Sequence, residues 1–185
     1  MEELWVPTLV ASAICLVISI LAWRVLPFHA RQHLRIPTEP QFLEALRKDL
    51  PPPGVYSFPF RGFADESASR IDVAANLERG PVGYLIVGPN GAERIGWRVV
   101  QQFLFFATVS TFTAYLLSHA GLKDGAPFLK VFRIAATVAM MSLVLGTVPQ
   151  SIWFFRPWKS WLLQCVDGLL CGAAIGATFA WFWPA

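Results

Sequence analysis

Long stretches without a charged residue constrain this 185-residue chain more than any other feature of its sequence. A helix rises about 1.5 Å per residue, so about 20 apolar residues are needed to cross the hydrocarbon core of a bilayer. Four stretches reach that length, with Asp167 the one charge among them, and they cover residues 4–23, 99–118, 134–155 and 160–185. The sequence therefore predicts four transmembrane helices.

The fold class that we expect is an all-α membrane protein with a small α+β cytoplasmic insertion between helices 1 and 2. A buried helical bundle in a soluble protein is the alternative. Only 15% of the residues are charged, whereas soluble domains carry about 25%, so we favour the membrane. The predicted segments are helix 1 at 4–26, the insertion at 27–97, helix 2 at 98–119, helix 3 at 131–155 and helix 4 at 159–184.

Lysine and arginine near the helix ends predict the orientation, because cytoplasmic loops carry an excess of them. Seven lie on the side of the insertion and three on the other. The seven are Arg24, Arg31, Arg35, Arg94, Arg98, Arg156 and Lys159, and the three are Lys123, Lys130 and Arg133. We therefore expect the insertion in the cytoplasm and both termini on the outer side of the membrane.

The insertion contains signals for two short helices and two short strands. Thr38 is a plausible cap for a helix that ends at Pro51-Pro52-Pro53-Gly54, and Asp65 to Arg79 is a second helix followed by Gly80. Val55 to Phe60 and Val82 to Val87 have the composition of strands. So small an element cannot bury a large core. We expect it to lie against the membrane or against a partner.

Catalytic and metal-binding patterns are absent from the sequence. His29 and His33 have the i, i+4 spacing of metal ligands, but no third ligand follows nearby, and interfacial histidines are the simpler interpretation. Cysteines 15, 165 and 171 form no Cys-x-x-Cys pair and are typical of helix packing. We predict no catalytic residues, no metal, no cofactor and no nucleic-acid partner.

Asp167 is the most informative residue of the chain, because a carboxylate within a membrane helix costs about 2.5–3.5 kcal/mol on insertion scales. Gln164 shares its helix face, and Gln101 and Arg98 begin helix 2 on the same side of the membrane. We predict an intramembrane polar cluster of these four residues. It is either a proton or ligand site or a structural clamp, in which Asp167 could pair with Arg98.

Three glycines follow Asp167 at intervals of four residues: Gly168, Gly172 and Gly176. Such a row forms a groove that lets another helix approach closely. Ser142 and Gly146 offer a matching small face on helix 3. The groove serves helix packing, either inside the chain or with another protein.

Four short stretches together resemble a group of bacterial inner-membrane proteins without an assigned function. These are Arg79-Gly80-Pro81-Val82-Gly83, Ser151-Ile152-Trp153, Pro157-Trp158 and Asp167-Gly168-Leu169. The resemblance covers nearly the whole chain. It implies one helix, a soluble segment and three further helices, together with a bacterial source.

Three function classes remain open. The first is an integral inner-membrane interaction protein, an accessory or scaffold subunit of a membrane complex, whose partners are the lipid bilayer and other membrane subunits or further copies of itself. The second is a small oligomeric transporter or channel that uses Asp167 as its protonatable group. The third is an enzyme acting on a substrate from the lipid phase. The absence of catalytic patterns and the glycine groove favour the first.

Overall fold

The computed structural model describes residues 4–30, 32–48, 51–60, 70–92 and 94–184. Within these ranges, four helical spans are long and apolar enough to cross a membrane: Trp5–Val25, Ile95–His119, Phe128–Trp153 and Trp158–Trp181. A two-stranded sheet lies between the first and second of them in the chain. The predicted combination of four apolar helices and a small α+β insertion is thereby confirmed, and it is consistent with a multi-pass membrane protein.

The chain forms two compact units. The helical unit comprises Met1–His33, Arg94–Ser151 and Arg156–Ala185. The ribbon unit comprises Leu34–Glu93 and Ile152–Phe155. The last two residues of the third span and the first two residues of the link after it therefore belong with the ribbon unit.

The helical unit consists of four long helices and their short extensions. α1 (Trp5–Ile20) continues through a π-helical turn (Leu21–Val25) into the single turn α2 (Pro27–Ala30). α5 (Ile95–His119) is uninterrupted. α6 (Phe128–Val144) passes through a 3-10 turn (Leu145–Thr147) into α7 (Val148–Trp153), and α8 (Trp158–Trp181) follows.

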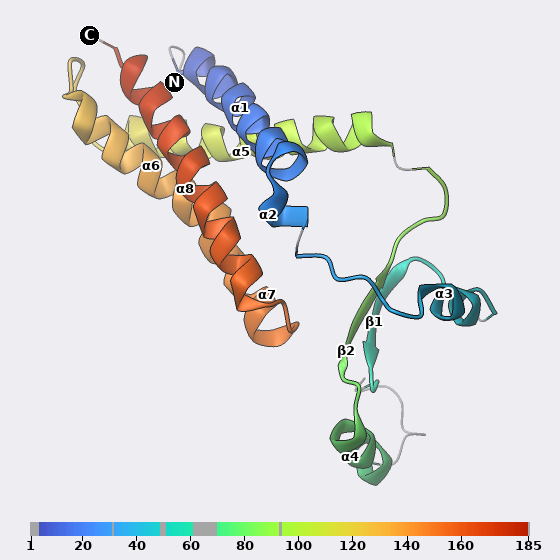
Figure 1. The fold of residues 1–185 in the computed structure, drawn as a ribbon. Coiled ribbons are helices and arrows are strands. Elements are labelled where there is room, and N and C mark those ends of the chain that lie inside the picture. Colours follow the sequence, from blue (N-terminus) through green and yellow to red (C-terminus); the bar gives the residue numbers. More distant parts are fainter. Residues whose placement is uncertain (1–3, 31, 49–50, 61–69, 93, 185) are drawn as a thin grey trace. The chain divides into compact units, whose positions relative to one another are not determined.

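Fully buried side chains line the contacts of α1, α6 and α8, so the core of the helical unit is closely packed. Ala11 and Cys15 of α1, Ala135 of α6 and Ile175 and Phe179 of α8 are fully buried. α6 and α8 run side by side along most of their length (Figure 1). Their apolar outer faces remain exposed, as expected for helices that meet lipid.

The glycine groove of α8 faces α6. A Cβ atom added to Gly168 would collide with Val144, and one added to Gly176 would lie 2.9 Å from Ala136 Cβ and 3.0 Å from the carbonyl oxygen of Phe132. Gly172 is similarly close to the backbone of α6. The groove thus serves packing inside the chain. Ser142 and Gly146, which the sequence suggested as its counterpart, are exposed instead.

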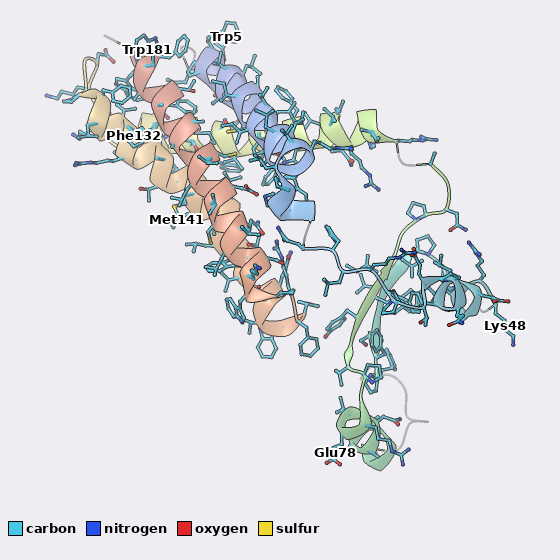
Figure 2. All side chains as sticks on the ribbon, viewed as in Figure 1. Trp5, Lys48, Glu78, Phe132, Met141 and Trp181 are labelled. Atoms are coloured by element: carbon cyan, nitrogen blue, oxygen red, sulfur yellow. The ribbon has the colours of Figure 1, made fainter. Side chains whose placement is uncertain are left out.

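The C-terminal end of α8 is fastened to the loop between α5 and α6. The indole Nε1–H of Trp183 donates to the carbonyl oxygen of Lys123 at 3.2 Å, and the amide of Gly125 donates to the carbonyl of Pro184 at 2.9 Å. Trp5 and Trp181 lie at this same end of the helical unit (Figure 2). The start of α1 and the end of α8 therefore share one end, which makes these helices antiparallel.

The ribbon unit is built on an antiparallel pair, β1 (Gly54–Phe58) and β2 (Gly83–Val87). α3 (Glu39–Lys48) precedes β1 and α4 (Arg70–Arg79) precedes β2, close to the predicted helices. The predicted start of the second helix at Asp65 lies outside the described residues. In Figure 1 α3 lies near one end of the pair and α4 near the other.

We predict that Gly176→Ala lowers the free energy of unfolding by about 1–3 kcal/mol, because the new methyl group must displace the α6 backbone. Gly96→Ala is the matched control, since nothing lies within 4 Å of its position in α5. That change should be neutral or stabilise by up to about 1 kcal/mol. The free energy of unfolding of both variants is measured in mixed micelles. Equal stability of the two would contradict the close contact of α6 and α8.

Candidate functional site

Asp167 meets His29 inside the helical unit. The Nε2 atom of His29 lies 3.0 Å from one carboxylate oxygen of Asp167 and 3.2 Å from the other. The side chain of His29 is 2% exposed and that of Asp167 is 19% exposed. A carboxylate in this position needs a donor, and the imidazole ring of α2 supplies one.

Gln32 extends this contact into a chain of three side chains. Its Nε2–H donates to Nδ1 of His29 at 2.7 Å. With Nδ1 accepting, the ring proton resides on Nε2, where it is donated to Asp167. This assignment follows from the hydrogen-bond network. If the amide turned over, Oε1 of Gln32 would accept from a protonated Nδ1, so the arrangement can hold the imidazole in either charge state.

The end of α1 determines where His29 lies. The π-helical turn Leu21–Val25 is followed by Leu26 in an extended conformation, and Pro27 begins α2. Proline suits the first position of a helix because its φ angle is already helical and no N–H is needed there. The change of direction brings His29 onto Trp23, whose ring stacks on the imidazole at 4.5 Å with 11° between the planes.

A second polar contact lies one turn before Asp167, near the start of α8. The guanidinium group of Arg156 donates to Oε1 of Gln164, and also to Oε1 of Gln150 at 3.3 Å. The Nε2 of Gln164 donates to the carbonyl oxygen of Leu143 on α6 at 3.3 Å. Gln164 thereby ties the link before α8 to the last turn of α6.

The four residues of the predicted polar cluster thus occupy different places. The described contacts of Asp167 are with His29, and those of Gln164 are with Arg156 and Leu143. Gln101 and Arg98 lie on exposed positions in the first turns of α5. For Asp167 the described ion pair is the one with His29, and its pairing with Arg98 stays a prediction.

The remaining candidate metal ligands do not lie together in one site. α2 ends at Ala30, so His33 lies beyond it and is exposed, and the predicted shared helix face does not form. Among the described residues, no group of three or more His, Cys, Asp or Glu side chains could hold a metal ion. Cys15 and Cys171 pack α1 against α8, with the thiol of Cys15 3.6 Å from the carbonyl oxygen of Cys171.

No protein-family model, curated protein or solved structure matches this chain. The site must therefore be interpreted from its own geometry.

Sequence reasoning did not connect His29 with Asp167, which are 138 residues apart. One signal could have done so. The predicted topology already placed the end of helix 1 and the start of helix 4 on the same side of the membrane, and Asp167 required a partner there. Gln32 carried no comparable signal, because a glutamine just outside a helix has many possible partners.

We predict that Asp167→Leu lowers the free energy of unfolding by about 1–3 kcal/mol, because the buried Nε2–H of His29 loses its acceptor. Asp167→Asn should cost less, since the amide oxygen can still accept that proton. Thermal or detergent unfolding of the purified protein compares the two variants. If Asp167→Leu were as stable as Asp167→Asn, the contact would contribute nothing to the fold.

Proposed function

We propose that this protein is an integral membrane interaction protein, an accessory or scaffold subunit of a complex in the bacterial inner membrane. The observation that carries the proposal is the first half of α5. From Ile95 to Phe105 no residue of this helix is buried, whereas its second half packs through Phe106, Val109, Ser110 and further residues. The first three turns of α5 thus contribute no buried residue to the helical unit.

One face of this segment combines apolar side chains with a polar one. Trp97, Gln101, Leu104 and Phe105 follow the spacing of a single helix face, and all four are exposed. Within the part of the chain that the structure describes, Gln101 makes no side-chain hydrogen bond. Its amide carries two donors and an acceptor that lipid tails cannot satisfy.

A glutamine on an apolar helix face is a recurrent means of joining helices in membranes. The glycine groove of α8 is already occupied by α6, so the exposed face of α5 is the better candidate for a partner helix. A partner helix could bind this face by offering a polar side chain to Gln101 and an apolar surface to Phe105. This supports a role in assembly.

The size of the native particle tests this proposal. Membranes are solubilised gently, separated under native conditions, and the proteins that travel with the chain are identified. We expect it in a larger assembly, and we expect Gln101→Leu to weaken that association about threefold to tenfold, since interhelical polar contacts contribute about 0.6–1.5 kcal/mol.

Thr111→Leu is the matched control for that experiment. Thr111 is exposed on the packed half of α5 and bonds to the carbonyl oxygen of Ala107 in its own helix. Its replacement should leave the assembly unchanged. Migration of the unmodified protein as a lone monomer would overturn the proposal.

The orientation that we propose places both termini in the periplasm and residues 27–97 in the cytoplasm. The support is the charge asymmetry of seven against three basic residues near the helix ends. Protease added to intact inverted vesicles should then cut within residues 28–96. Protection there, with cleavage from the periplasmic side, would reverse the orientation.

A second candidate function is a small oligomeric transporter or channel with Asp167 as its protonatable group. The contact of His29 with Asp167 favours it, because it places an imidazole ring, a common proton donor and acceptor, against a carboxylate inside the helical unit. In proteoliposomes, Asp167→Asn should abolish proton flux, whereas Asp124→Asn in the loop before α6 should not. Absence of flux from the unmodified protein would exclude this function.

A further inference from the structure

One face of the ribbon unit carries two strongly exposed apolar side chains. Val55 pairs with Ile86 across the two strands, and Ser57 pairs with Tyr84. Residues two apart along a strand point to the same side, so these four side chains share one face. Val55 is 65% exposed and Ile86 is 77% exposed. Neighbouring apolar side chains this exposed call for a surface to cover them.

The same face carries an aromatic anchor. The ring of Tyr84 contacts Phe154 with centroids 5.1 Å apart and Phe155 with centroids 6.0 Å apart. Both phenylalanines are part of the ribbon unit. They also belong to the short link between the span that ends at Trp153 and the span that begins at Trp158.

Chain connectivity fixes the depth of that link. A link of four residues between two membrane spans has to lie at the boundary of the bilayer. Trp153 and Trp158 flank it and are both exposed, as tryptophans are at the headgroup level. Tyr84 packs on this link, so its face of the ribbon adjoins residues that lie between the two tryptophans in the chain.

The two strands also need support from outside. A two-stranded sheet is marginally stable by itself in water. α3 and α4 lie near opposite ends of the pair (Figure 1). An apolar surface next to Phe154 and Phe155 would supply that support.

We propose that the face formed by Val55, Ser57, Tyr84 and Ile86 rests on the lipid bilayer, with Val55 and Ile86 inserted at the headgroup level. The occupant of this face is lipid rather than protein, because the face continues directly into the aromatic residues at the membrane boundary. None of its four side chains is charged. The contact therefore requires apolar burial and does not require anionic lipid.

Fluorescence quenching in the full-length protein tests this contact. Val55→Cys and Ile86→Cys are labelled with a small thiol-reactive fluorophore in a Cys165→Ala background, since Cys15 and Cys171 are buried. The unsubstituted background, treated identically, measures residual labelling. Vesicles of zwitterionic lipid contain either a lipid with a headgroup-level nitroxide or aqueous iodide outside. Glu44→Cys and Glu78→Cys, on exposed positions of α3 and α4, are the matched controls.

We expect the nitroxide lipid to quench labels at 55 and 86 about threefold more than labels at 44 and 78, and iodide to show the opposite order. The pattern should persist when anionic lipid is added. Equal iodide access at all four positions would overturn the proposal, because the face would then lie in water. Protection of 55 and 86 from both quenchers would also overturn it, since protein would then cover the face.

Discussion

A carboxylate inside an apolar helix is the constraint on which the arrangement of this protein depends. Asp167 cannot face lipid without a large cost, so the fold has to bring a donor to it. His29 meets this need from the other end of the sequence, at 3.0 Å. The π-helical turn after α1 and the proline at the start of α2 place the ring there, so the path of the first span is tied to the middle of the fourth.

This contact specifies position more than it adds stability. A buried polar pair offsets the desolvation of its own members and often contributes little beyond that, whereas loss of one member is costly. The stability of the helical unit comes from close packing of its helices instead. The glycine groove of α8 admits the backbone of α6, and Cys15 and Cys171 allow α1 to approach α8. These three helices form a tight group, to which the first half of α5 contributes no buried residue.

The sequence predicted the elements well and the contacts poorly. Uncharged runs revealed all four spans because the thickness of a bilayer sets a minimum length, and the strands near Val55 and Val82 followed from local composition. The row of glycines predicted a packing groove, but its partner face on α6 depended on rotation of that helix. The pairing of His29 with Asp167 depended on an irregular turn after α1, which no periodicity in the chain announces.

A double-mutant cycle between His29 and Asp167 tests the central claim most directly. His29→Leu, Asp167→Leu and the double variant are compared by their free energies of unfolding. If the two side chains are partners, the double variant loses less than the sum of the single variants, by at least about 0.5 kcal/mol, since neither buried group is then left without its partner. Losses that add within about 0.3 kcal/mol would show that the two residues do not interact.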